Sequence, residues 1–182
     1  MKVSIQGIKG SFHHMVAANY FSSFELNECS TFDKLVKSII DKDSEYGVMA
    51  IENSIAGSIL PNYALIDKYN LSITGEYSLS IDHNLMCLPG QGIEDIEEVH
   101  SHPMALLQCT KFFTAYPQIK LIESEDTALF AKKIRENKIN GVAAIASKEA
   151  ADIYDLEILY YSIQTIKNNI TRFVIVEKNK QN

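Results

Sequence analysis

Short apolar segments alternate with amphipathic helical segments along most of this chain, and this alternation is the feature that most constrains its fold. Val3 and Ile5 alternate with polar residues before Gly7, as in a strand, whereas 32–40 carries apolar residues at helical spacing. Strands that alternate with helices predict an α/β protein with largely parallel sheets. In such proteins ligands bind at the carboxyl ends of strands, beside the N-termini of helices.

The same patterns predict the remaining elements. Strands are expected at 46–51, 71–76, 79–88, 98–100, 119–122, 141–146, 157–161 and 171–176, and helices after Gly10, at 60–69, after Pro103, at 128–135 and after Ser147.

Composition and charge narrow the classes of protein that fit. The chain has 182 residues, 46% of them hydrophobic, and a net charge of -6, which repels nucleic acid and anionic membranes. Cys29, Cys87 and Cys109 lie among apolar neighbours, as reduced core thiols do. The N-terminus lacks a signal-peptide-like apolar run, and no window is apolar enough to span a membrane. We therefore expect a cytoplasmic protein.

Polar residues gather where predicted strands end and helices or turns begin. They occur at Gly10-Ser11, Glu52-Asn53-Ser54, Ser101-His102, Asp126-Thr127 and Ser147. Each alone is typical of a helix cap, because these side chains accept hydrogen bonds from the first free N–H groups of a helix. Several such helix starts around one ligand would direct backbone N–H groups and partial positive charge at an anion. Both interpretations, structural caps and a shared anion site, follow from the pattern.

Two short segments carry side chains suited to a small carboxylate. Asn53 and Ser54 offer an amide and a hydroxyl, and Glu52 is either a buried hydrogen-bonded carboxylate or an acid/base group. The segment 171–173, Thr-Arg-Phe, offers a hydroxyl, a guanidinium that forks onto a carboxylate, and a ring. The alternative is an exposed arginine at a strand end beside a core phenylalanine.

Other chemistries have no support in the sequence. The five histidines and three cysteines show none of the spacings of a metal site, and we expect no metal. The glycines at 7 and 10 form neither a Walker loop nor a GxGxxG fingerprint, which argues against nucleoside triphosphate and NAD.

Six motifs occur in one order along the chain. They are GIKGSF at 7–12, IENSIAGS at 51–58, SHPMALLQC at 101–109, DTA at 126–128, AAIASKEAA at 143–151 and NNITRF at 168–173. Together they resemble the catalytic region of the prephenate dehydratase family.

The resemblance implies a fold and an activity. The fold would be α/β and two-lobed, like a type II periplasmic binding protein, with the active site in the cleft between the lobes. One lobe would comprise 1–75 plus 165–182, and the other 76–164. The reaction converts prephenate to phenylpyruvate, carbon dioxide and water in L-phenylalanine biosynthesis, and it needs no cofactor. Family members commonly form homodimers and continue into a regulatory ACT domain, which no segment of this sequence fits.

The resemblance also implies residue roles. Thr171 would donate a proton or hydrogen bond to the departing hydroxide, with Glu52 as the neighbour that relays a proton. Arg172 would clamp a carboxylate and Phe173 would border the ring. The remaining substrate-binding candidates are Asn53, Ser54, Ser11, Ser101 and Thr127.

The sequence departs from the family pattern at several positions. Ile8 replaces a proline, Ser11 a threonine and His13 a serine, while Ala56 and the Gln164-Thr165 pair stand where acidic residues are usual. The loss of acidic groups favours prephenate over arogenate, whose amino group would need an acidic partner.

Two alternatives accompany this hypothesis. The histidines at 13 and 14 would be either pH-dependent anion ligands or exposed residues of a first helical turn. The protein as a whole would be either an enzyme or a noncatalytic module that binds a small carboxylate or amino acid, because fold does not determine function.

Overall fold

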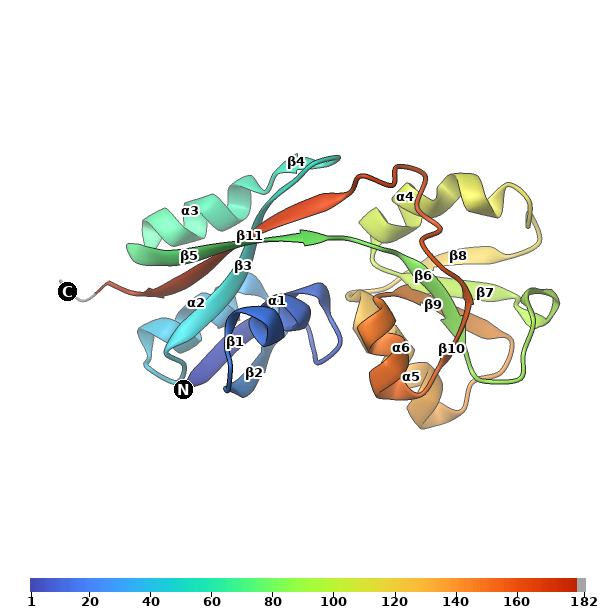
Figure 1. Ribbon diagram of the computed structural model, residues 1–182, viewed down its shortest axis with the longest axis horizontal. Coiled ribbons are helices and arrows are strands. Elements are labelled where there is room, and N and C mark those ends of the chain that lie inside the picture. The colour runs from blue at the N-terminus through green and yellow to red at the C-terminus, as the bar shows by residue number, and fades with distance from the viewer. Residues whose placement is uncertain (180–182) are drawn as a thin grey trace. The chain divides into compact units, whose positions relative to one another are not determined.

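The computed structural model describes residues 1–179, which form two compact units (Figure 1). Unit 1 joins Met1–Ile81 to the chain from Asn168 onward, and unit 2 is the continuous segment Asp82–Lys167. The predicted boundaries at 75/76 and 164/165 were too early. The strand that ends unit 1's first segment runs to Ser80 and pairs along its length with the C-terminal strand.

Unit 1 is built on a mixed sheet with the strand order β2-β1-β3-β11-β5. The strands are β1 (Lys2–Gln6), β2 (Glu25–Cys29), β3 (Tyr46–Asn53), β5 (Leu71–Ser80) and β11 (Ile170–Lys178), and the short β4 (Gly57–Ser58) pairs with β3. β1 is parallel to β2 and β3, but β11 is antiparallel to both β3 and β5.

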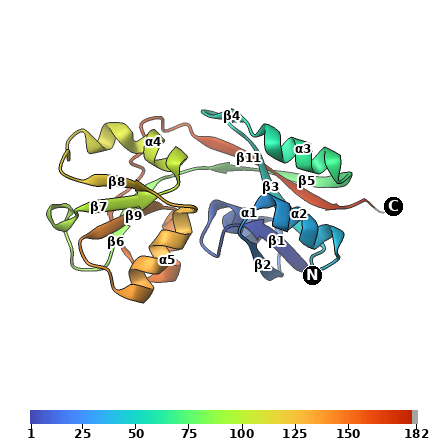
Figure 2. The ribbon, with the colours of Figure 1, turned by 180° about the vertical axis from the view of Figure 1, so that it is seen from behind.

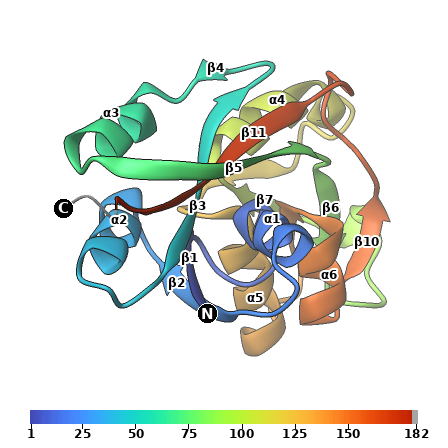
Figure 3. The ribbon, with the colours of Figure 1, turned by 60° about the vertical axis from the view of Figure 1, so that its left-hand side comes forward.

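Three helices cover the two faces of this sheet. They are α1 (Phe12–Tyr20), α2 (Phe32–Ile40) and α3 (Leu60–Lys68), and Figure 2 shows α2 and α3 side by side. The α1-side core consists of Val3, Ile5, Val16, Ala17, Val48, Ala50, Phe173 and Ile175. The α2-side core consists of Cys29, Leu35, Val36, Ile39, Met49, Ile51, Ile66, Leu71, Val174 and Val176. β11 contributes alternate residues to both cores, and it lies alongside β5 in Figure 3.

Unit 2 has a second mixed sheet with the order β10-β6-β9-β7-β8. Its strands are β6 (Asn84–Cys87), β7 (Glu98–Ser101), β8 (Lys120–Glu123), β9 (Val142–Ala146) and β10 (Glu157–Tyr160), and its helices are α4 (Pro103–Phe113), α5 (Thr127–Asn137), α6 (Lys148–Tyr154) and the 3-10 turn η1 (Ile93–Asp95). β7 is parallel to β8 and β9, whereas β6 is antiparallel to β9 and β10.

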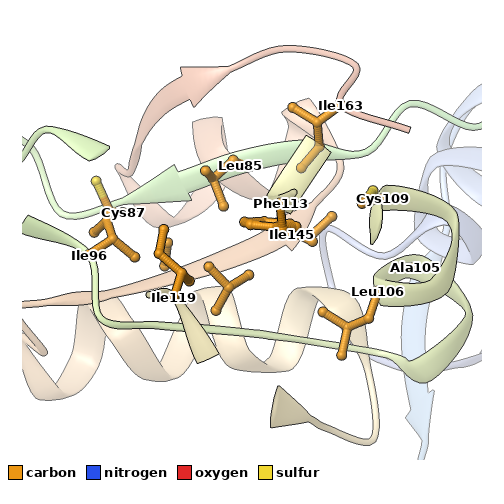
Figure 4. Packing of buried hydrophobic residues seen from close by; sticks show 12 residues of the cluster. Leu85, Cys87, Ile96, Ala105, Leu106, Cys109, Phe113, Ile119, Ile145 and Ile163 are labelled. Atoms are coloured by element: carbon orange, nitrogen blue, oxygen red, sulfur yellow. The ribbon is translucent and has the colours of Figure 1, made fainter. Parts of the chain in front are cut away.

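The core of unit 2 contains two of the three cysteines (Figure 4). Cys87 and Cys109 are fully buried among aliphatic and aromatic side chains, and Cys29 is buried in unit 1. Burial raises the pKa of Cys87 to about 11 and that of Cys109 to about 12, so both remain thiols near neutral pH. The prediction of core thiols is confirmed.

Two expectations about the strands were wrong. The sheets are mixed rather than largely parallel, because β11 returns between β3 and β5 and because β6 runs against β9. The segments 71–76 and 79–88 were expected as separate strands, but 71–80 is one strand and β6 covers only 84–87. Among the described residues, no helix combines the length and apolar character that crossing a membrane requires.

The two first-turn histidines of α1 point into packed surroundings. His14 is buried, and the ring of His13 lies edge-on to Phe173 and Phe32, with centroids 5.1 and 5.4 Å apart. The Nε2 atom of His13 is buried and has no hydrogen-bond partner among the described residues. Burial lowers the pKa of His13 from 6.5 to about 4. Neither histidine is exposed, so the interpretation of the two as exposed residues of a first helical turn is wrong.

The packing of His13 predicts a pH-dependent stability. The folded state holds this imidazole neutral, so between pH 6.5 and 4 the unfolded state binds more protons. Lowering the pH from 7.5 to 4.5 should therefore cost the wild type about 2 to 3 kcal/mol more than it costs His13→Phe, which keeps a ring but cannot titrate. Urea unfolding of both proteins at the two pH values measures this difference. Equal losses in the two proteins would contradict the assignment.

Candidate active site

The end of β3 and the start of β11 lie opposite each other and bring two sequence motifs into contact. Asn53 pairs with Thr171 and Glu52 with Arg172 in the antiparallel ladder. The next pair is Phe173 with Ala50, so Ile51 is an extra residue on β3 and forms a β-bulge. Bulges of this kind redirect the side chains that follow them.

Asn53 connects the two strands through its side chain. Its Nδ2 donates to Thr171 Oγ1 at 2.9 Å and to Asn169 Oδ1 at 2.7 Å. Its Oδ1 accepts from the backbone N–H groups of Ile55 and Ala56 at 3.0 and 2.9 Å. The amide thus joins a turn after β3 to the hydroxyl on β11.

Ser54 forms hydrogen bonds with the backbone of the segment that leads into β11. Its N–H donates to the Ile170 carbonyl at 2.8 Å, and its Oγ accepts from the Ile170 N–H at 2.9 Å. The hydroxyl also donates to the Asn168 carbonyl at 3.2 Å. All of these contacts are internal to unit 1, so Ser54 acts on the backbone next to Thr171.

Arg172 belongs to a separate charged group. Its Nη2 donates to Glu52 Oε2 at 2.9 Å and to the Tyr63 hydroxyl at 3.2 Å, and its Nη1 lies 3.5 Å from Glu76 Oε2. Partial burial alone would lower the pKa of Arg172, but the hydrogen bond to Glu52 and the electrostatic interactions with Tyr63, Glu76 and Glu52 raise it overall. The guanidinium therefore stays charged at any physiological pH.

Thr171 and Arg172 point to opposite faces of the sheet. Successive residues of a strand alternate between faces. Phe173 and Ile175 lie in the α1-side core, so Thr171 shares their face, whereas Val174 and Val176 lie in the α2-side core on the face of Arg172. The structure brings Thr171 together with Asn53, and Glu52 together with Arg172 rather than with Thr171.

Two other predicted substrate-binding residues of unit 1 have structural roles in the fold. Phe173 is only 1% exposed, so almost none of its ring surface is open to a ligand. Ser11 is the N-cap of α1, and its Oγ accepts from the His14 N–H at 3.2 Å. These positions match the alternatives of a core phenylalanine and a structural cap.

The predicted residues of unit 2 lie at strand ends and helix starts. Ser101 is buried and donates to the Ile145 carbonyl at 2.7 Å. Thr127 is the first residue of α5, whose N-cap is Asp126; that carboxylate accepts from the N–H groups of Ala128 and Leu129 at 2.7 and 2.9 Å. Capping thus accounts for the first N–H groups of this helix.

Three residues of these clusters were not predicted as site residues. Asn169 lies within a motif but carried no assigned role, although it accepts a hydrogen bond from Asn53. Tyr63 and Glu76 come from α3 and β5 and reach Arg172 only through tertiary pairing. Only Asn169 had a signal in the sequence, namely its position two residues before Thr171. Within residues 1–179, no three histidine, cysteine, aspartate or glutamate side chains are grouped as metal ligands.

The sequence matches a family model and several curated relatives. The model described as prephenate dehydratase matches residues 3–181. The bifunctional chorismate mutase/prephenate dehydratase of Buchnera aphidicola subsp. Acyrthosiphon pisum is 37% identical over 180 residues, which are 97% of this chain and 47% of that protein. The chain thus spans about half the length of the curated relatives that it matches.

Solved structures agree in fold. The prephenate dehydratase of Staphylococcus aureus subsp. aureus Mu50 is 28% identical, with a TM-score of 0.82 over all of this chain and 67% of that chain. GqqA, described as a novel type of quorum quenching acylase, is also 28% identical, with a TM-score of 0.86 over 98% of this chain and 64% of that chain. Lipoprotein Tp32 from Treponema pallidum, at 10% identity and a TM-score of 0.50 over 98% and 83% of the two chains, shares the fold alone.

These likenesses confirm the predicted α/β fold, which the solved prephenate dehydratase shares over the whole of this chain. The family model covers every motif from which the resemblance was drawn, including the two whose residues meet between β3 and β11. The chain belongs to the prephenate dehydratase family.

Proposed function

We propose that this protein converts prephenate to phenylpyruvate, carbon dioxide and water, as a step of L-phenylalanine biosynthesis. One observation carries the proposal: in a chain of this family, the Thr171 hydroxyl is held by Asn53 at 2.9 Å where the two motifs cross. A cytoplasmic location and a homodimer belong to the same proposal.

The reaction requires little from the protein beyond substrate binding and one hydrogen-bond donor. The bond between the ring and its carboxylate breaks, carbon dioxide leaves, and the electron pair enters the ring. The ring expels the 4-hydroxyl group, which takes up a proton from the solvent and leaves as water, so atoms and charge balance. Because aromatisation supplies the driving force, help to the leaving oxygen is the main catalytic contribution, and such help is typically worth about 10² to 10⁴ in rate.

Thr171 is the residue that we assign to the leaving oxygen. Its side chain is held within the sheet and the residue is 8% exposed. A threonine hydroxyl is too weak an acid to transfer its proton fully, so it acts as a preorganised hydrogen-bond donor. One such donor is worth about 10² to 10³ in turnover.

Arg172 is the carboxylate-binding residue of the proposal. Because its side chain leaves the face of the sheet opposite to that of Thr171, this role requires the guanidinium to reach the substrate around the end of β11. Its Nη2 is engaged by Glu52 and Tyr63, whereas among residues 1–179 its Nη1 has only the 3.5 Å contact with Glu76. Nη1 is therefore the part of the guanidinium that can turn to a substrate carboxylate at least cost. On this view Glu52 holds the guanidinium in place and relays no proton to Thr171, which lies on the other face.

Replacement of Thr171 tests the function. Thr171→Val keeps the shape of the side chain but removes the hydroxyl, so kcat should fall by about 10² or more. Thr171→Ser keeps the hydroxyl and should retain most of the turnover. Formation of phenylpyruvate from prephenate, followed by absorbance of its enolate, measures both.

Two outcomes would reject the proposal. One is a wild-type chain without turnover of prephenate, and the other is equal turnover by the wild type and Thr171→Val. Assays with arogenate in parallel measure substrate preference. Stoichiometric binding of a small carboxylate without any turnover would point to the noncatalytic module instead.

Replacement of Arg172 tests the clamp. Arg172→Lys substitutes a single ammonium group for a planar fork, so KM for prephenate should rise about 10-fold while kcat changes little. Glu52→Gln keeps a hydrogen-bond acceptor for the guanidinium. It should change kcat less than threefold, because Glu52 supplies no proton in this proposal. Steady-state kinetics of the two variants separate the roles. A large loss of kcat in Glu52→Gln would instead support a proton relay through Glu52. An unchanged KM in Arg172→Lys would mean that Arg172 has a purely structural role.

A further inference from the structure

We propose that Asn53 is a positioning residue that makes the Thr171 hydroxyl a hydrogen-bond donor toward the substrate. This inference rests on the proposed function and concerns the direction in which one proton points. It follows from the four closest partners of the Asn53 amide, which lie 2.7 to 3.0 Å from its oxygen or nitrogen.

The orientation of the Asn53 amide is fixed by chemistry. Two backbone N–H groups, those of Ile55 and Ala56, point at one end of the amide. An N–H group can only donate, so the atom that faces it must be the carbonyl oxygen. The amide nitrogen therefore faces β11, and a reversed amide would place four donor hydrogens against one another.

The nitrogen in turn fixes the role of Thr171. An amide NH₂ has two protons and only donates. Its two short contacts go to Asn169 Oδ1 at 2.7 Å and to Thr171 Oγ1 at 2.9 Å, whereas the Ile170 carbonyl is farther away, at 3.4 Å. Thr171 Oγ1 must accept this hydrogen bond, which keeps its own proton out of the contact. Within the described part of the chain, the Thr171 hydroxyl donates to no residue. Its proton is thus available to an acceptor that the chain does not supply, such as a leaving hydroxyl group.

The β-bulge at Ile51 brings the amide to this position. In a regular ladder that continued from the Phe173–Ala50 pair, Thr171 would stand opposite Glu52. A carboxylate in that place would accept the Thr171 proton and leave none for a substrate. The extra residue moves Asn53 opposite Thr171 and moves Glu52 to Arg172.

An isosteric substitution reverses the direction of this hydrogen bond. In Asn53→Asp, one carboxylate oxygen can still accept from the Ile55 and Ala56 N–H groups, while the other accepts the Thr171 proton. We expect kcat for prephenate to fall about 10²-fold with KM changed less than threefold. The remaining kcat should rise as the pH falls through the pKa of the new carboxyl group, because the protonated group can donate again. Wild-type kcat should show no such rise.

Three comparison variants separate this effect from added charge and from loss of shape. Asn53→Ala leaves the hydroxyl free to rotate and should lose less kcat, about 10-fold. Asn168→Asp puts the same charge on an exposed side chain of the same segment and should retain near wild-type kcat. In a Thr171→Val background, Asn53→Asp should cause no further loss, because its effect passes through the hydroxyl. Urea unfolding of each variant verifies that it is folded.

The outcomes distinguish this inference from the proposed function. If the wild type turns over prephenate and Thr171→Val does not, but Asn53→Asp keeps its kcat, the function stands and the positioning role is wrong. The positioning role would also be wrong if Asn168→Asp lost as much kcat as Asn53→Asp, or if Asn53→Asp lowered kcat by its full factor in the Thr171→Val background. Either result would indicate charge repulsion instead. Should Asn53→Asp not fold, a loss in Asn53→Ala as great as that in Thr171→Val, with the fold retained, would contradict the proposal. A wild type without turnover rejects the function itself.

Discussion

The antiparallel pairing of β3 with β11 is the constraint on which the rest of unit 1 depends. It joins residues that are at least 118 positions apart in the chain, the separation of Asn53 and Thr171. The same pairing inserts β11 between β3 and β5 and so completes the sheet. Because one ladder both closes the core and aligns the polar groups, a shift of register would damage stability and chemistry together.

Much of the fold could be predicted from hydrophobic periodicity. The stripe over 32–40 corresponds to α2, Phe32–Ile40, because a helix that buries one face repeats its apolar residues at that spacing. β2, Glu25–Cys29, was missed because it is an edge strand with mostly exposed or half-buried residues and no alternation to detect. Strand direction also escaped prediction, since periodicity carries no information on which strands become neighbours.

The site could be predicted as a set of residues but not as a geometry. Motifs identified Asn53, Thr171 and Arg172. The predicted strand at 171–176 implies that the last two leave opposite faces, but not which partners each of them meets there. The bulge at Ile51 could not be predicted from the sequence, because it exists only as a mismatch between two paired strands. Phe173 shows the same limit: its place in the tripeptide suited a ligand-facing ring, whereas packing against α1 buries it.

The division of unit 1 into two chain segments has a consequence for synthesis on the ribosome. Unit 2 is continuous and can fold as soon as it emerges, but β5 has no partner other than β11 within the described sheet. At typical translation rates of about 5 to 20 residues per second, the first segment waits on the order of 10 s for its last strand. During that interval the edges of β3 and β5 that β11 later covers are open to other chains, and such open edges favour aggregation.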